Sequence, residues 1–332
     1  MILRSLLLAL VPLGAGCDTV SYYRQAIGGH LEIMQAARPV EAWLADPATN
    51  TELRQRLETA RRIRTFASRG LGLPDNRSYT SYAELGRPFV VWNVFAAPEL
   101  SVEPRQECFP LAGCVSYRGF FSEEDARRRA GQLRAEGYDV HVSGVPAYST
   151  LGWFDDPLLS TFIRYPDAQL ARLVFHELAH QLVYARDDTT FNESFAVAVE
   201  EEGVRRWLEA EGRAAELETF RAAQARRKVF ALEVKETRAR LAAAYRDGTA
   251  TRETLLGRKR EELDKLRAKY PAIVPAEANN AFLVSIALYT ELVPQFEELL
   301  RQSASLEAFY EKVRELAKSG KRLSGQSNLG PS

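Results

Sequence analysis

Apolar residues recur at two different spacings along the chain, and the change of spacing divides the chain into parts. In residues 18–75 they fall three and four positions apart, which predicts two helices interrupted near Pro39. In residues 79–160, β-branched and aromatic residues dominate runs such as 87–95, which predicts strands. Helical spacing returns from residue 167. The pattern predicts an α+β fold that is mostly helical and contains a small β-sheet.

The most apolar predicted helix contains two histidines four residues apart. Residues 170–184 are apolar on nearly every side, which is typical of a buried helix. His176 and His180 share one face of it, and two converging imidazoles provide half of a tetrahedral zinc site. Glu177 completes an H-E-x-x-H motif, in which the glutamate serves as general base toward a water molecule. The alternative is two core histidines beside a chance glutamate, but burying Glu177 is costly unless a metal or hydrogen bonds compensate. The sequence therefore predicts a Zn²⁺ site.

The third protein ligand is expected downstream of this motif. No histidine follows His180, so a carboxylate is required. Residues 186–190 are typical of a short polar turn, which would make the next helix an antiparallel neighbour and bring Glu193 back toward His180. Glu200 is the competing ligand, but it lies two helical turns beyond Glu193, too far for both to bind one metal. The spacing favours His176, His180 and Glu193 as the metal ligands.

The first residues are typical of a targeting segment. Arg4 gives a positive start, and residues 5–13 form an apolar stretch too short to span a bilayer. The run Gly14-Ala-Gly-Cys17 resembles a lipobox, which predicts a signal peptide at 1–16 and a lipid on Cys17. An ordinary cleaved secretory signal is the alternative. Asp18 resembles a signal that retains such proteins at the inner membrane. We expect a chain that is lipid-anchored on the periplasmic side of a bacterial membrane.

Two loops of the β-rich part contain residues that predict a disulfide or a place in the substrate cleft. Cys108 and Cys114 are the cysteines that remain, and in an exported protein they predict a disulfide. A second zinc site there would need further ligands, and no histidine or cysteine lies nearby in the sequence.

Residues 148–157 directly precede the motif helix. They either line a substrate cleft through Gly152 and Trp153 or plug the core with their aromatic side chains.

These motifs together resemble the bacterial putative aminopeptidase family of zinc lipoproteins. The likeness includes residues 175–196, FHELAHQLVYARDDTTFNESFA, and covers nearly the whole mature chain; its other parts are Cys17 with Tyr22-Tyr23, residues 108–120 (CFPLAGCVSYRGF, which contain Tyr117), Gly152-Trp-Phe-Asp-Asp-Pro157, Asn279-Asn-Ala, Tyr289 and Val293-Pro294. The resemblance implies a zincin-like metallopeptidase of the gluzincin type that acts on a peptide or protein substrate. Two features of better-known gluzincins are missing. The Gly-x-Met-Glu-Asn motif that binds free α-amines is absent, and Val197 stands where thermolysin-like enzymes place an aspartate that orients a zinc histidine. Another residue must therefore orient that histidine.

The mature chain, 17–332, is expected to form a single zinc metallopeptidase domain. Its expected parts are N-terminal helices (18–75), a β-rich part (79–160), the zinc-site helices (167–211), a helical region (212–318) and a flexible tail (319–332). The helical region is highly charged, which predicts a long hairpin that covers the cleft or binds an envelope protein partner. Tyr289 lies on a more apolar helix of this region. It is a candidate for hydrogen-bonding the developing oxyanion, and a buried core tyrosine is the alternative.

The overall charge excludes one class of partner. The 332 residues contain 44 Lys and Arg against 44 Asp and Glu, so no basic field attracts nucleic acid. The sequence predicts zinc-dependent peptide-bond hydrolysis of the aminopeptidase type. Two alternatives stay open: a zinc-bearing scaffold lipoprotein without catalysis, and an endopeptidase with one specific protein substrate.

Overall fold

The computed structural model describes residues 14–109 and 113–319. The predicted signal peptide therefore falls mostly outside the described residues, as do the side chain of Cys17 and all of the predicted tail except Ser319. Within the described part, the N-terminal region forms three helices rather than the two predicted, namely α1 (Gly14–Ala36), α2 (Val40–Ala45) and α3 (Thr51–Leu71). The break at Pro39 is present, and the short strand β1 (Arg38–Pro39) occupies it.

The β-rich part forms three small sheets rather than one. In the central sheet, β3 (Val91–Pro98) lies between β6 (Arg118–Phe120) and β7 (Tyr138–Val145), with both pairings antiparallel. A second sheet joins β1 to β2 (Ser81–Ala83) and β8 (Leu158–Leu159), and a third pairs β4 (Glu107–Phe109) with β5 (Gly113–Val115). The single sheet expected from the sequence is therefore divided into three, because most of its strands are short and are separated by loops.

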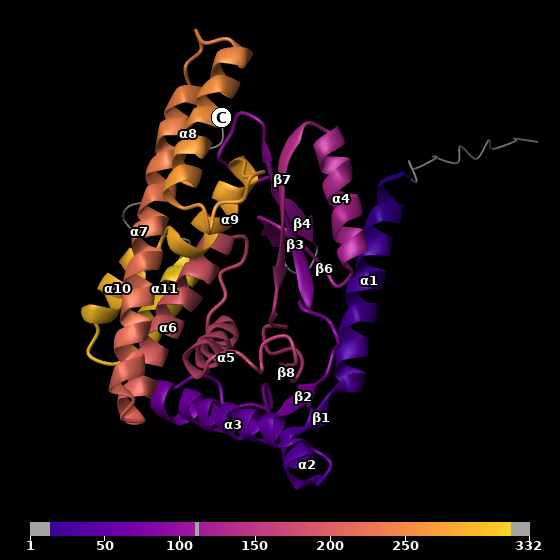
Figure 1. The fold of residues 1–332 in the computed structure, drawn as a ribbon, viewed down its shortest axis with the longest axis vertical. Coiled ribbons are helices and arrows are strands. Elements are labelled where there is room, and N and C mark those ends of the chain that lie inside the picture. Colours follow the sequence, from indigo (N-terminus) through magenta and orange to yellow (C-terminus); the bar gives the residue numbers. More distant parts are fainter. Residues whose placement is uncertain (1–13, 110–112, 320–332) are drawn as a thin grey trace, which may run out of the picture.

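Both faces of the central sheet are covered by helices, as Figure 1 shows. Trp92 and Val94 on β3 pack with α4 (Glu123–Ala135), whereas Phe95 faces α9 (Asn280–Thr290). Successive strand residues point to opposite faces, so a strand between two helices is buried along its length. This explains why residues 87–95 are apolar without alternation.

The motif helix and the helix after it pack against each other as antiparallel neighbours. α5 (Asp167–Leu182) and α6 (Thr189–Ala210) are joined by a short turn, as predicted. The side chain of Asp188 caps α6 by accepting a hydrogen bond from the N–H of Phe191 at 2.9 Å. Asn192 bonds both backbone groups of Ala185, at 2.7 and 2.8 Å, and so fixes the turn. A Cβ atom on Gly203 would lie 2.7 Å from the ring of Phe175, which shows how closely the helices approach.

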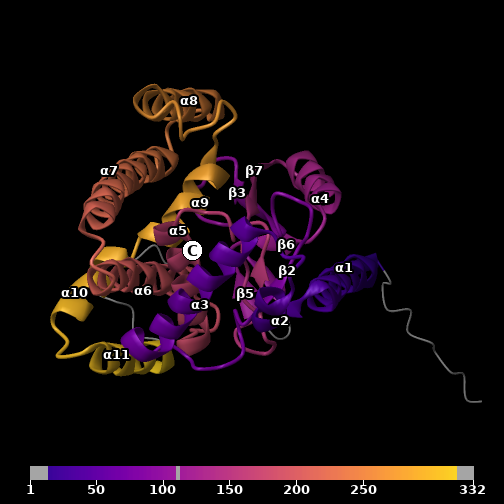
Figure 2. The same ribbon diagram turned by 60° about the horizontal axis from the view of Figure 1, so that its bottom comes forward.

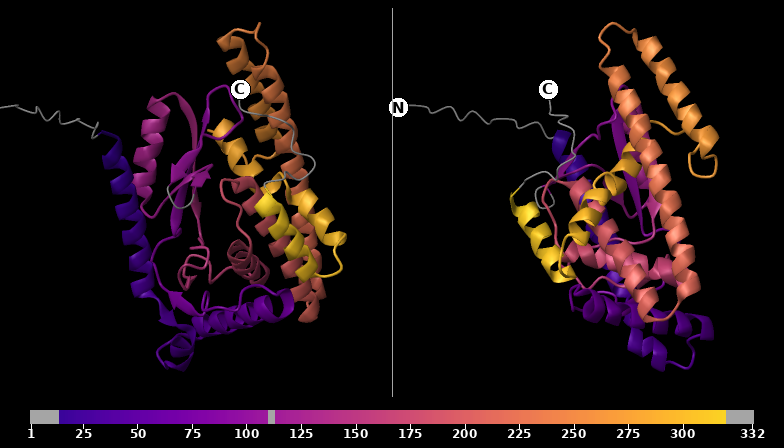
Figure 3. Two further views of the ribbon diagram at one scale, coloured as in Figure 1. Left: turned by 180° about the vertical axis from the view of Figure 1, so that it is seen from behind. Right: turned by 90° about the vertical axis from the view of Figure 1, so that its left-hand side faces the viewer.

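The C-terminal region contains the predicted hairpin. α7 (Ala214–Tyr245) and α8 (Arg252–Lys269) pack around an apolar cluster that they share with Phe282 and Leu283, and they extend beyond the rest of the molecule (Figure 3). The chain then returns through α9 to α10 (Val293–Arg301) and α11 (Leu306–Ser319). In Figures 1 and 2, α1 and α7 lie on opposite sides of the molecule. None of the helices in the described ranges is long and apolar enough to cross a membrane. The fold is mostly helical α+β.

Candidate metal centre

Three buried side chains from α5 and α6 converge on one point. The Nε2 atoms of His176 and His180 lie 3.2 Å apart. Oε2 of Glu193 lies 3.3 Å from Nε2 of His176 and 3.5 Å from Nε2 of His180. The antiparallel packing of α5 and α6 produces this geometry, because it brings residues in the second half of α5 beside residues near the start of α6.

The spacing of these atoms fits a tetrahedrally coordinated metal ion. Zinc–ligand bonds of about 2.0–2.1 Å in a tetrahedral site place neighbouring ligand atoms about 3.3–3.4 Å apart. The three observed separations bracket that value. Two imidazole nitrogens and one carboxylate oxygen are also ligand types that Zn²⁺ prefers. The group can therefore hold a metal ion.

Attraction between opposite charges also stabilises this group. Burial disfavours protonated His176, but hydrogen bonds to Glu193 and Glu200 outweigh burial and raise the pKa of His176 to about 10. Burial also disfavours ionised Glu193, but the two histidines lower its pKa far below the usual range. Because ligating imidazoles are neutral, a metal ion would compete with this proton.

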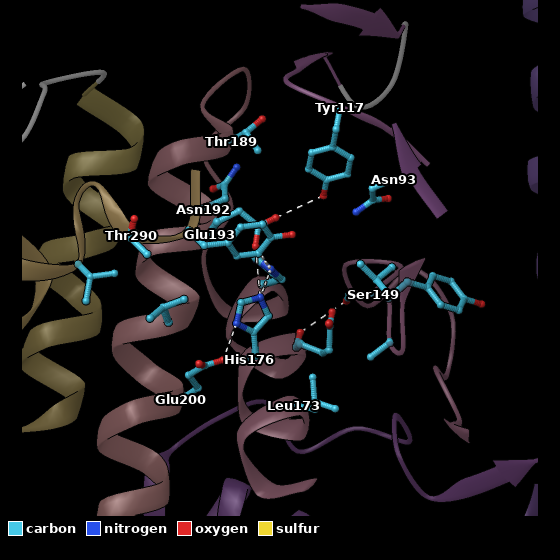
Figure 4. A pocket seen from close by; sticks show the side chains of 18 of the residues that line it. Asn93, Tyr117, Ser149, Leu173, His176, Thr189, Asn192, Glu193, Glu200 and Thr290 are labelled. Carbon is cyan, nitrogen blue, oxygen red and sulfur yellow. Dashed lines mark hydrogen bonds and ion pairs between the residues drawn. The ribbon is translucent and has the colours of Figure 1, made fainter. Parts of the chain in front are cut away.

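Glu200 lies behind His176 rather than beside Glu193. Nδ1–H of His176 donates to Oε2 of Glu200 at 2.8 Å, and Nε of Arg172 lies 3.2 Å from Oε1 of the same carboxylate. Figure 4 shows Glu193 and Glu200 on opposite sides of the His176 ring. A carboxylate at Nδ1 fixes the tautomer that leaves Nε2 free to bind a metal. Glu200 thus occupies the orienting position for which Val197 has no suitable side chain. Nδ1 of His180, in contrast, is buried without a hydrogen-bond partner among the described residues.

Glu177 is buried beside the ligands and makes no side-chain hydrogen bond within the described ranges. Burial raises the pKa of its carboxyl group; the two histidines of the motif oppose this, and Glu193 and Asp156 add to it. Its backbone carbonyl accepts from the hydroxyl of Ser149 at 3.5 Å. The carboxyl group is therefore adjacent to the metal-binding group but free to contact a bound molecule.

Two tyrosines approach this group from other elements. The ring of Tyr289, on α9, stacks near that of His176 with centroids 6.4 Å apart. The hydroxyl of Tyr117, just before β6, donates to Oε1 of Glu193 at 3.3 Å (Figure 4). Burial and the nearby Glu193 raise the pKa of both tyrosines well above 10, so both hydroxyls stay protonated and can donate. The sequence indicated Tyr289 as a candidate, whereas Tyr117 lies in a run that carries the family resemblance but was assigned no role.

The disulfide predicted from the sequence is present and holds the segment that carries Tyr117. Cys108 and Cys114 are bonded across the β4–β5 pair. The N–H of Cys114 donates to Oδ1 of Asp187 at 2.5 Å, and that of Ser116 to Oγ1 of Thr189 at 3.3 Å. The segment is thereby fixed against the turn between α5 and α6.

A cleft of about 900 Å³ contains the metal-binding group. One wall comes from the central sheet and the segment after β7, and the opposite wall from α6, α9 and α7. Tyr148, Ser149 and Leu151 line it, but Trp153 is 82% exposed and does not, which corrects one expectation for residues 148–157. The expectation that the aromatic side chains of this segment plug the core is also wrong for Trp153 and Phe154, since Phe154 is 53% exposed. The hairpin contributes to the cleft through side chains of α7 such as Lys228, Leu232 and Lys235.

The fold and this group together define a mostly helical α+β protein with a buried His-His-Glu cluster that can hold a metal ion. The chain belongs to the putative aminopeptidase family, whose model matches residues 21–326. The match covers nearly the whole described region and confirms the resemblance inferred from the motifs. No curated protein and no solved structure matches the chain.

Proposed function

We propose that this protein is a zinc-dependent peptidase of the zincin type, with His176, His180 and Glu193 as the metal ligands. The observation that carries the proposal is the convergence of these three ligand atoms, 3.2–3.5 Å apart, inside a large cleft and beside Glu177, whose carboxyl group has no hydrogen bond to the described residues. A structural zinc site is usually closed by four protein ligands. Within the described ranges this group has three, which favours catalysis over the scaffold alternative.

A metal ion held by His176, His180 and Glu193 would act as a Lewis acid toward the peptide carbonyl group and would make water more acidic. Glu177 accepts a proton from the attacking water and then donates it to the leaving amine. Tyr289 donates a hydrogen bond to the developing oxyanion. Tyr117 positions Glu193 through the hydrogen bond to its second oxygen.

The family description supports action at free amino termini. No Gly-x-Met-Glu-Asn motif is present in the sequence to bind the α-amine, so this preference is proposed on the family alone.

We also propose that a lipid on Cys17 holds the chain at the periplasmic face of the inner membrane. The lipobox-like run before Cys17 and Asp18 after it support this part.

The test is cleavage of a peptide library in which every peptide is present with a free and with an acetylated amino terminus. We expect the zinc-loaded protein to remove single residues from free termini, while Glu177→Gln retains the metal and loses cleavage. Internal cuts that are indifferent to acetylation would make it an endopeptidase. Equal cleavage by Glu177→Gln and the unaltered protein would refute the assignment of the general base.

A further inference from the structure

An exposed apolar patch lies where α1 meets the loop before β8. Trp153 is 82% exposed and Phe154 is 53% exposed. Ile27 and Leu31, one helical turn apart on α1, are 58% and 49% exposed. The ring of Phe154 lies against that of His30, with centroids 4.5 Å apart, and so joins the loop to this helix. We call Ile27, Leu31, Trp153 and Phe154 the apolar patch.

The opposite face of α1 is used within the protein. Ile33 is fully buried, Tyr22 stacks on Phe109 with centroids 5.1 Å apart, and Gly29 lies against Phe121. The face that carries Ile27 and Leu31 is therefore turned away from the body, at the side of the molecule opposite α7 (Figures 1 and 2). Exposed clusters of large apolar side chains of this kind are typical of interaction sites.

The position and composition of the patch fit a bilayer surface. The predicted acylation point, Cys17, is in the same helix, ten residues before Ile27, which is about 15 Å along the axis. Tryptophan is enriched at the level of lipid headgroups because its ring is amphipathic. Arg24, exposed on the same helix near Ile27, would contact anionic headgroups. A helix with one face on the protein and an apolar outer face can lie in the plane of the interface.

We propose that the apolar patch binds the membrane surface, so that α1 lies parallel to the plane of the bilayer. The patch is then a second membrane contact in addition to the lipid anchor. Two contacts together fix the orientation of the cleft relative to the membrane. Ala26 and Leu151, close to the patch residues Ile27 and Trp153 in sequence, line the cleft at this end. If the proposed peptidase function holds, its substrates are then peptide segments at the bilayer surface rather than peptides in free solution.

The test uses the full chain, produced with its own N-terminal segment and reconstituted into vesicles of three parts phosphatidylcholine and one part phosphatidylglycerol. The readout is quenching of tryptophan fluorescence by phosphatidylcholine that carries a doxyl group near the headgroup. Trp92 and Trp207 are buried and Trp43 is half-buried, so Trp153 is the exposed reporter. We expect clear quenching, most of which is lost in Trp153→Phe.

A pair of double variants supplies the matched comparison. Ile27→Ser with Leu31→Ser should reduce the quenching at least twofold, because the patch loses its contact with lipid. Val229→Ser with Leu232→Ser changes two residues of similar exposure, 58% and 57%, on α7 at the other side of the molecule, and should leave the tryptophan quenching unchanged.

Three outcomes would overturn the proposal. They are failure of the chain to associate with the vesicles, association without quenching of Trp153, and a dimer in detergent that Trp153→Ser abolishes. The last outcome would assign the patch to a second copy of the chain. None of these measurements depends on peptide cleavage or bound metal, so failure of this proposal is distinguishable from failure of the proposed peptidase activity. Mass spectrometry of the purified chain for lipid on Cys17 distinguishes failure of the patch from failure of the anchor.

Discussion

Nδ1 of His176 lies 2.8 Å from Oε2 of Glu200, on the edge of the ring opposite to Glu193. Arg172 holds the other oxygen of that carboxylate at 3.2 Å, so the three side chains form a chain of contacts leading to the metal-binding group. Carboxylates in this position raise the basicity of a ligating imidazole and fix its orientation. From the sequence alone, Glu200 is a competing metal ligand. In the structure it takes instead the role of orienting His176, for which the side chain of Val197 is unsuitable.

Replacing Glu200 should weaken metal binding without abolishing it. Loss of such an orienting carboxylate typically costs about 10–100-fold in metal affinity. We expect Glu200→Gln to show a loss in this range by competition with a zinc chelator, whereas Glu193→Gln should bind zinc far more weakly still. Glu202→Gln is the control, since Glu202 pairs with Arg205 and Arg206 away from the cleft. The reverse ranking of Glu193 and Glu200 would make Glu200 the ligand.

The two tyrosines should give different kinetic effects when each loses its hydroxyl. Removing a donor to an oxyanion costs about 10²–10³-fold in kcat, so we expect Tyr289→Phe to lower kcat with little change in zinc affinity. Tyr117→Phe should instead lower zinc affinity a few-fold, because Oε1 of Glu193 loses its donor. Steady-state kinetics at saturating zinc, together with chelator competition, separate the two effects. Interchanged results would assign the catalytic hydroxyl to Tyr117.

Asp156 should make the protein less stable as pH rises. Burial raises its pKa to about 6, above its unfolded value, although bonds from Thr150 and Ser149 oppose the effect. The folded state therefore binds more protons between about pH 4 and pH 6, and its stability falls as pH rises through that window. The loss is on the order of 2–3 kcal/mol above pH 7.

Asp156→Asn isolates this contribution, because an amide retains an acceptor for the N–H of Thr150 and carries no charge. The difference in Tm between Asp156→Asn and the unaltered protein should increase in favour of the variant from pH 4.5 to pH 7.5. Carboxyl groups that do not interact with Asp156 cancel in the difference; Glu177, whose pKa Asp156 raises, is compared by repeating the pair of measurements in the Glu177→Gln background. A constant difference across this range would show that Asp156 titrates normally.

Gly203 should be intolerant of larger side chains. A Cβ atom there would lie 2.7 Å from the ring of Phe175 and 2.8 Å from Leu71, so Gly203→Val forces α6 away from α5. Overpacking of this kind costs about 1–3 kcal/mol, measurable by thermal or denaturant unfolding. Gly257→Val, on α8 with no neighbour within 4 Å of the added Cβ, is the comparison; an equal loss in both would reflect helix propensity alone.

The sequence predicted those parts of the site that depend on local periodicity. The motif helix, expected within residues 170–184, is α5 (Asp167–Leu182), and a short turn brings Glu193 to it. The role of Glu200 depends on how two packed helices are rotated relative to each other, which periodicity within one helix does not determine. Tyr117 comes from a segment 76 residues before Glu193, and no local pattern links them.

Sheet formation was also predicted incompletely. The strands were predicted by composition, but their division into separate sheets depends on long-range pairing, such as the parallel contact of β2 with β8. Local propensity carries little information about such pairings.

The central claim is that His176, His180 and Glu193 bind one catalytic metal ion, and metal analysis tests it most directly. The chain would be purified without chelators, and zinc per chain would be measured by plasma mass spectrometry for the unaltered protein, Glu177→Gln and His180→Ala with Glu193→Ala. We predict about one zinc per chain in the first two and almost none in the third. Equal zinc in all three, or no zinc binding by the unaltered protein even after zinc is added, would contradict the account.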